Sequence, residues 1–305
     1  MKPLGRIPGI NRKRSSDLAR LASLYWSRTF SAGGMKTWMA EEVCRGYINK
    51  KVTGDIHEWP IEWFGRVYAE VPFEKGLSIG CGEGALERDV RRKQICRNVE
   101  GIDISATALE VARSTAEAEG LSGIRYSRGD FNRFQLPPSH YDIVFVHQAM
   151  HHVAELEHCM YQIASTLKQG GLLYLDEYIG PSRTEWRQEL LLDVNRVYRK
   201  LPAALRLGTE IPEPVENDDP SEAIRSSEII PVMEEYFQTV DRRDYGGNLL
   251  ALITPYIRWD SLDPSQRFEM LLELVAQEER LLETGVGSYY TVIVAAATHN
   301  SSSPW

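Results

Sequence analysis

The sequence predicts an α/β fold with a doubly wound, mostly parallel sheet, joined by helical segments at the N-terminus and in two insertions. Between residues 73 and 180, short apolar strand patterns alternate with helical patterns through short connections. This alternation is typical of a parallel sheet with right-handed crossovers. Helical patterns precede this region and interrupt the chain after it, which indicates additions to the basic scheme.

The composition is that of an ordinary globular enzyme. The chain has 305 residues, of which 43% are hydrophobic and 26% are charged, so a large core is expected and disorder is not. The longest apolar run, 292–297, is far shorter than the roughly 18 residues of a membrane span. No early apolar stretch indicates a secretory signal. Four widely spaced cysteines without a CxxC pair favour a reducing cytoplasm over a disulfide framework.

Charge is distributed unevenly along the chain. Residues 1–40 carry eight Lys or Arg and one acid, Asp17, whereas the remainder carries 27 basic and 42 acidic residues. An acidic body argues against nucleic-acid binding as the main activity. The basic head is interpreted as a solvated tail, with a docking arm or a targeting segment as alternatives.

The central region contains five predicted strands, each close to a helical pattern. The strands are expected at 76–81, 98–104, 124–129, 141–146 and 172–175. Ser105 is expected to cap a helix that ends at Gly120, and Gly170-Gly171 ends a later one. This region, taken as 73–180, is predicted to be the core domain.

The flanking segments are predicted to be caps. The expected division is an N-terminal helical segment 1–72, a helical insertion 181–236, and a final strand pair within 237–305 that is split by a helical insertion at 247–285. Ser16 is expected to cap the first helix, and Asp219-Pro220 to begin another. Blocks 16–71, 183–236 and 247–285 have apolar faces. We expect them to form a lid over the carboxyl edge of the sheet.

A glycine-rich turn follows the first strand. Gly80, Gly82 and Gly84 allow a tight turn and a close approach of backbone N–H groups to a ligand. With Ala85 and Asp103, the same turn also satisfies a dinucleotide-binding pattern. Asp103 ends the second strand, where its carboxylate can bind a ribose diol under either interpretation.

Asp130 and Phe131 close the third strand, where a carboxylate and an apolar ring suit an adenine base. The later strands form a split pair instead of a second mononucleotide half. This set of motifs resembles the class I S-adenosylmethionine-dependent methyltransferases, in their small-molecule branch, which implies a Rossmann-like sheet with an antiparallel last strand. The likeness covers residues 76–180 well. The residues expected to bind S-adenosylmethionine are Gly80, Cys81, Gly82, Gly84, Asp103, Ile104, Asp130, Phe131 and His147.

One position departs from the pattern of that family. The family often has an acidic residue two positions before the first glycine, and here Ser78 stands there. The cofactor's amino group is then left to backbone carbonyls, to water, or to another acid such as Glu83 or Glu87.

Histidines gather after the fourth strand. His147, His151 and His152 lie where ligands of open α/β sheets bind, and an imidazole is the natural general base near neutral pH. We expect one of the three to remove a proton from the acceptor. A zinc site that includes His158-Cys159 is the weighed alternative, but it lacks identifiable further ligands, and no metal is predicted.

The end of the fifth strand supplies further candidates. Glu177 is a second candidate base, which makes the candidate catalytic residues His147, His151, His152 and Glu177. Aromatic and basic residues nearby are candidates for the pocket wall. The candidate substrate-binding residues are Tyr25, Trp26, Tyr178, Arg183 and Trp186.

The resemblance implies a methyltransferase acting on a small polar metabolite or a glycan-type acceptor, at oxygen or nitrogen. Two alternatives stay open: an enzyme that uses the same cofactor for cyclisation or aminocarboxypropyl transfer, and a cofactor-binding scaffold without turnover. No nucleic acid or membrane is expected as a partner, and a homodimer is compatible with the sequence.

Overall fold

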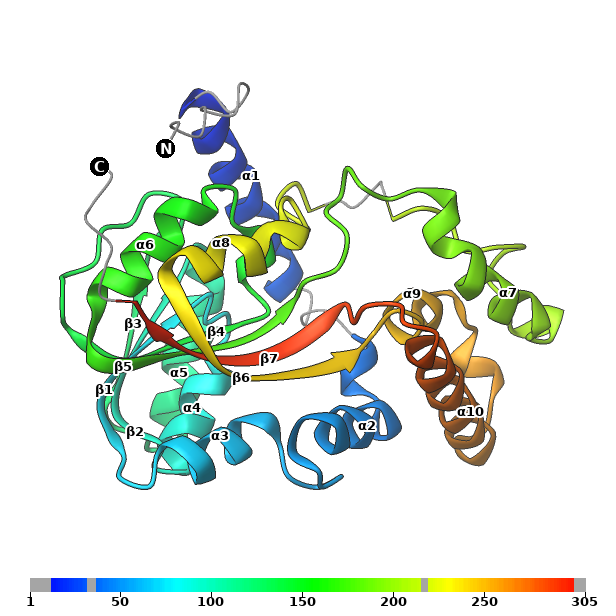
Figure 1. The fold of residues 1–305 in the computed structure, drawn as a ribbon, viewed down its shortest axis with the longest axis horizontal. Coiled ribbons are helices and arrows are strands. Elements are labelled where there is room, and N and C mark those ends of the chain that lie inside the picture. The colour runs from blue at the N-terminus through cyan, green and yellow to red at the C-terminus, as the bar shows by residue number, and fades with distance from the viewer. Residues whose placement is uncertain (1–11, 32–36, 215–218, 299–305) are drawn as a thin grey trace.

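A computed structural model describes residues 12–31, 37–214 and 219–298. The sheet has seven strands in the order β3-β2-β1-β4-β5-β7-β6 (Figure 1). The strands are β1 (Phe73–Ile79), β2 (Cys96–Asp103), β3 (Ile124–Arg128), β4 (Tyr141–His147), β5 (Leu167–Tyr178), β6 (Phe237–Gly246) and β7 (Tyr290–Ala297). The first five pair in parallel, and β7 lies antiparallel between β5 and β6. The predicted Rossmann-like fold class, with its antiparallel last strand, is confirmed.

Helices cover both faces of the sheet because its central strands are apolar on both sides. In β4, the residues 143–146 are all fully buried. One face packs against α6 (Leu156–Thr166) and α8 (Ile229–Tyr236), and the other against α3 (Pro60–Tyr68) and α4 (Ala85–Arg92) (Figure 1). Both faces are thereby removed from water, as expected for a parallel sheet.

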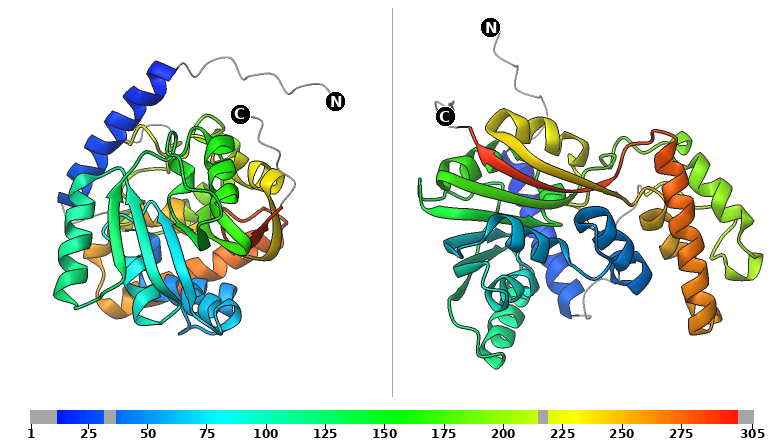
Figure 2. Two further views of the ribbon diagram at one scale, coloured as in Figure 1. Left: turned by 90° about the vertical axis from the view of Figure 1, so that its left-hand side faces the viewer. Right: turned by 60° about the horizontal axis from the view of Figure 1, so that its bottom comes forward.

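The N-terminal helices do not all lie above the carboxyl edge. Helix α1 (Arg12–Ser31) runs beside α5 (Ala106–Ala118) at the β3 side of the sheet (Figure 2). Helix α3 instead packs on the sheet face, where Phe64 lies 5.0 Å from the ring of Tyr174. The expectation that the whole block 16–71 covers the edge is therefore wrong for α3, because Phe64 is fully buried in the core on the sheet face.

Local predictions of helix starts also need correction. Helix α1 begins at Arg12, so Ser16 lies inside it and does not cap it. Asp219 does not begin a helix: its carboxylate accepts the N–H of Ser221 at 2.8 Å within a turn, and α8 starts only at Ile229. An Asp-Pro pair suits a turn as well as a helix start.

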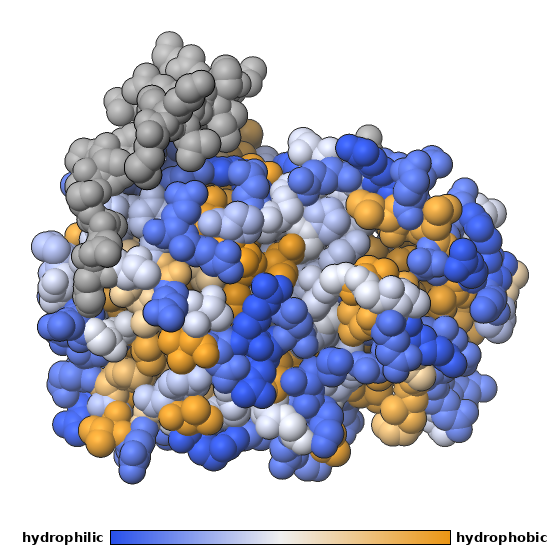
Figure 3. Space-filling model, viewed as in Figure 1, coloured by the Kyte–Doolittle hydropathy of each residue, from blue (hydrophilic) through white to orange (hydrophobic). Residues whose placement is uncertain are grey.

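Beyond the end of β6, several helices form a separate lobe. It contains α7 (Leu192–Lys200), α9 (Leu250–Ile253) and α10 (Pro264–Glu283), and α2 (Glu42–Thr53) packs between α10 and β6 (Figures 1 and 2). Apolar patches lie over this lobe, and others lie over the middle and the lower left of the same face (Figure 3). Among the described residues, no helix is long and apolar enough to cross a membrane. All four cysteines are free and buried.

Candidate cofactor and acceptor site

The glycine turn between β1 and α4 has the backbone that its sequence predicts. Gly80, Gly82 and Gly84 all have positive φ angles of 72°, 50° and 75°, which favour glycine. A side chain at Gly80 would clash with the Cβ of Ala149, and one at Gly84 with the hydroxyl of Tyr126. The glycines therefore set both the turn and its close packing on neighbouring strands.

Asp103 fixes this turn from the end of β2. One of its carboxylate oxygens accepts the N–H of Gly82 at 2.9 Å, and the other accepts the N–H of Ser105 at 2.7 Å. Burial raises the pKa of Asp103 above its usual value, while these N–H groups oppose the rise. Each carboxylate oxygen has a further lone pair, so the residue can still accept from a ligand hydroxyl.

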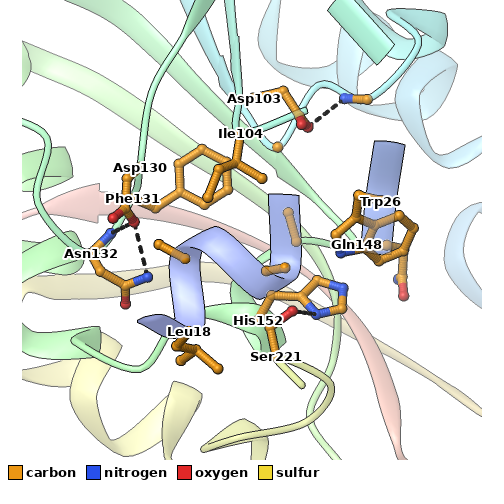
Figure 4. Close-up of a pocket in the computed structure, with 15 residues that line it drawn as sticks. Leu18, Trp26, Asp103, Ile104, Asp130, Phe131, Asn132, Gln148, His152 and Ser221 are labelled. Atoms are coloured by element: carbon orange, nitrogen blue, oxygen red, sulfur yellow. Dashed lines mark hydrogen bonds between the residues drawn. The ribbon is translucent and has the colours of Figure 1, made fainter. Parts of the chain in front are cut away.

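Asp130 and Phe131 lie on the loop after β3 and face the same cavity as Asp103 (Figure 4). Asp130 accepts from the backbone and side-chain nitrogens of Asn132 at 3.0 and 3.1 Å. Phe131 is 9% exposed. Ile104 also lines the cavity, so that carboxylates and apolar surfaces alternate along the wall, as a nucleoside requires.

Helix α1 closes this cavity on its outer side. The hydroxyl of Ser23 donates to the carbonyl of Ile104 at 3.2 Å, and Ser27 lies 3.2 Å from the hydroxyl of Ser105. Leu18, Ala22 and Trp26 line the wall (Figure 4). The cavity volume is about 120 Å³.

His151 is held away from the cavity by a buried carboxylate. Its Nδ1 bonds to Glu177, which also accepts the N–H groups of Ala149 and Met150 at 2.9 and 2.6 Å. Burial alone lowers the pKa of an imidazole, but the carboxylates of Glu177 and Glu222 raise the pKa of His151 to about 9. His151 and its charge in turn hold the pKa of Glu177 low against the effect of burial. The pair is therefore an imidazolium–carboxylate pair at neutral pH.

His152 is the histidine that lines the cavity, together with Ser221 (Figure 4). Its Nδ1 lies 3.2 Å from the Ser221 hydroxyl, which donates to Asp219 at 2.6 Å. This arrangement places the ring proton on Nδ1 and leaves the lone pair on Nε2. Burial and the charge of His151 lower the pKa of His152, against the opposing effect of Glu222 and Asp219.

The other histidines lie elsewhere. His147 ends β4 outside the cavity, with its Nε2 3.6 Å from Asp176. His158 bonds to the carbonyl of Phe134, and Cys159 is buried in the core, so the weighed zinc set is not assembled. The structure instead brings together His151, His152 and Glu222, whose ligand atoms lie within 4.8 Å of one another.

The candidate substrate residues are dispersed. Trp26 lines the cavity and packs edge-on against His152 at 5.1 Å, and Tyr25 packs edge-on against Trp26. Tyr178 lies 6.0 Å from the ring of His151. Trp186 packs on Tyr289, and Arg183 donates to the carbonyl of Pro220, so that it braces the turn that carries Ser221.

Sequence reasoning missed several residues of the cavity. Gln148 lines it and has a φ of 51°, which is strained for a residue with a side chain. Its amide bonds to Asp176 and Tyr245 at 3.3 Å. Ser221 and Asn132 were also missed, and only their polar turn motifs, Asp-Pro-Ser-Glu and Gly-Asp-Phe-Asn, offered a signal.

Comparison with known proteins identifies the core of the chain. A family model described as a methyltransferase domain matches residues 77–175, which run from β1 to β5 and include the glycine turn, Asp103 and Asp130. Residues 77–175 thus match a methyltransferase domain. The cofactor of this family is S-adenosylmethionine.

Individual relatives match about a third of the chain. It is 33% identical over 106 residues to a sterol 24-C-methyltransferase of Aspergillus fumigatus, covering 34% of this chain and 28% of that protein. It is 36% identical over 109 residues to a ubiquinone biosynthesis O-methyltransferase of a Chelativorans species, covering 35% and 42%. The chain thus spans less than half the length of these relatives. The [4+2]-cyclase SpnF shares the fold, with a TM-score of 0.51 and 14% identity over 92% of this chain and 94% of that one.

The residues of the methyltransferase domain fit the cofactor. A carboxylate suited to hydroxyl groups (Asp103), a carboxylate beside an aromatic ring (Asp130 and Phe131) and a glycine turn border one cavity. These are the groups that a ribose, an adenine and an amino-acid moiety require.

Proposed function

We propose that the protein is an S-adenosylmethionine-dependent methyltransferase that acts on a small polar metabolite or a glycan-type acceptor. One observation carries the proposal: the cavity that Asp103 and Asp130 border is also lined by His152 and Ser221 (Figure 4). A nucleoside site and a proton-accepting group thus share one enclosed space. The buried free thiols favour a reducing compartment, the cytoplasm.

The chain's own contribution is alignment, exclusion of water and proton removal. When bound, the cofactor supplies an activated methyl group on its sulfonium. The glycine turn and the two acids hold the donor, while α1 covers the cavity and keeps water away. His152, kept neutral by burial and by the charge of His151, accepts the acceptor's proton at Nε2. Ser221 and Asp219 hold the opposite side of its ring.

The experiment that tests this function is product analysis. The purified protein is incubated with cell extract and S-adenosylmethionine labelled on the methyl group. A methyltransferase transfers the label to an acceptor and releases S-adenosylhomocysteine in equal amount. Release of methylthioadenosine instead would show cyclisation or aminocarboxypropyl transfer, and tight cofactor binding without any product would support a scaffold.

A further inference from the structure

A second cavity lies beside the cofactor cavity, against another face of helix α1. Its volume is about 370 Å³, within the usual range for small-molecule sites. It is lined from α1 by Ala19, Arg20, Ser23 and Leu24, and from the ends of β2 and β3 by Ile104, Arg128, Gly129 and Asp130. The two cavities have only Ala19, Ile104 and Asp130 in common. The second cavity is therefore a distinct space beside the first.

Two guanidinium groups border this cavity from different elements. Arg20 belongs to α1 and Arg128 ends β3, and both residues are exposed. No hydrogen bond or ion pair joins Arg20 to another described residue. Nε of Arg128 donates to the carbonyl of Ile104 at 3.1 Å, and its Nη2 donates to the hydroxyl of Ser23 at 3.2 Å. Neither guanidinium is thus paired with a carboxylate of the described residues.

The acid in this lining does not neutralise both charges. Oδ1 of Asp130 accepts from the backbone and side-chain nitrogens of Asn132 at 3.0 and 3.1 Å. Oδ2 of Asp130 lies 3.9 Å from Nε of Arg133. Two arginines and one aspartate give the lining a net charge of +1, in a chain whose net charge is −8. The cavity therefore favours an anion, against the charge of the molecule as a whole.

We propose that this cavity binds a phosphate group between Arg20 and Arg128. Guanidinium groups form paired, charge-assisted hydrogen bonds with phosphate oxygens, and a phosphate has enough oxygens to bond to two of them at once. The bound group compensates both charges and connects α1 to the end of β3. A neighbouring face of α1 carries Leu18, Ala22 and Trp26 of the cofactor cavity. The phosphate therefore also holds that wall in place.

The rim of the second cavity is apolar on the α1 side. Leu24 lines the cavity and is 50% exposed, and Leu21 is 45% exposed one helical turn earlier. A phosphate with an apolar substituent, such as a lipid headgroup, therefore fits the rim, and so does a free phosphate. Both ligands share the phosphate chemistry that the two arginines recognise.

Calorimetric titration with inorganic phosphate, in phosphate-free buffer at constant ionic strength, tests the site. Arg20→Gln should weaken binding about tenfold, because it removes charge-assisted hydrogen bonds to the ligand and no contact within the described structure. Arg128→Gln should have a similar effect. Arg28→Gln is the matched control, since it removes an exposed arginine of the same helix that does not line the cavity. It should change the affinity less than twofold.

Hydrogen exchange gives a second measure of the same binding. Phosphate should slow exchange in the 18–29 segment of the wild type, because it connects α1 to β3. Arg20→Gln should lose this protection, and Arg28→Gln should keep it. Neither probe involves the cofactor, so the outcome does not depend on the proposed function.

Vesicles of phosphatidylcholine, with and without phosphatidic acid, distinguish the source of the phosphate. Binding only to vesicles that contain phosphatidic acid, lost in Arg20→Gln, supports the site and identifies a lipid headgroup. Binding of inorganic phosphate with the same dependence on Arg20 supports it and identifies a free phosphate. If neither probe binds, or if Arg28→Gln weakens binding as much as Arg20→Gln does, the assignment is overturned.

Discussion

Two adjacent histidines differ in charge because their neighbours differ. His151 is paired with Glu177 and has a pKa of about 9, whereas burial beside that charge lowers the pKa of His152. At pH 7 the first is an imidazolium and the second a neutral base. The Ser221 hydroxyl, 3.2 Å from Nδ1 of His152, fixes the tautomer that leaves Nε2 free. His151 is charged because the carboxylates of Glu177, Glu222 and Asp219 raise its pKa. His152 is neutral because it is buried next to that charge.

The first prediction concerns His152. His152→Asn should lower kcat by about 10²-fold, because the acceptor loses its base, while cofactor affinity should change little. In the wild type the rate should fall as the pH drops below the lowered pKa of His152, since protonation removes the lone pair. This acid limb should be absent in the variant. The pH–rate profile of purified protein with its acceptor measures both effects.

A control keeps this prediction specific. His158 bonds to a backbone carbonyl away from the cavity, so His158→Asn should retain both the wild-type rate and the acid limb. If His152→Asn keeps a wild-type rate and profile, alignment alone drives the reaction and His152 is not the base.

Helix α1 forms the outer wall of the cavity at the edge of the sheet. Its serines bond to the segment after β2, and its Trp26 packs against His152. Because α1 contacts both the Asp103–Asp130 part of the cavity and His152, we expect it to tighten when ligands bind. The broader lid of residues 183–236 and 247–285, and the division of the chain into domains, stay predictions.

The prediction for α1 is an exchange experiment. Amide hydrogens of the 18–29 segment should exchange more slowly with S-adenosylhomocysteine bound, because the ligand adds contacts to Trp26 and Ala22. Trp26→Ala should reduce this protection and raise KM for the acceptor more than it lowers cofactor affinity. Identical exchange with and without ligand, in the wild type, would exclude a closing role for α1.

The elements differed in how readily the sequence predicts them. Strands β1, β4 and β5 follow from short apolar runs between glycines and polar turns, because burial on both faces leaves few alternatives. The position of α3 did not follow, because the apolar stripe of an amphipathic helix does not tell which surface it meets. In the structure, Phe64 of α3 packs on Tyr174 of β5, which places this helix on the sheet face.

The sequence predicts those parts of the candidate site that depend on backbone conformation. Glycines with positive φ and an acid at a strand end are visible in sequence, and Asp103 bonds to Gly82 accordingly. Contacts between distant segments were not visible. The pairing of His152 with Ser221 spans 69 residues, and only the folded chain brings them together.

At the scale of the whole molecule, the cofactor site and the helical lobe occupy different regions. The cavity lies between α1 and the ends of β2 and β3, and the lobe of α7, α9 and α10 lies beyond β6 (Figure 1). The sheet between them carries His152 and Gln148 after β4. The family model matches residues 77–175, and the helices of this lobe lie outside that match.

The central claim is that this one cavity binds S-adenosylmethionine, and calorimetric titration with S-adenosylhomocysteine tests it most directly. We expect one site per chain, and a loss of about tenfold or more in Asp103→Asn, because the weakened acceptor binds ribose hydroxyls less well. NAD should give no binding. Binding of NAD in place of S-adenosylhomocysteine, or an affinity for S-adenosylhomocysteine that Asp103→Asn leaves unchanged, would contradict the account.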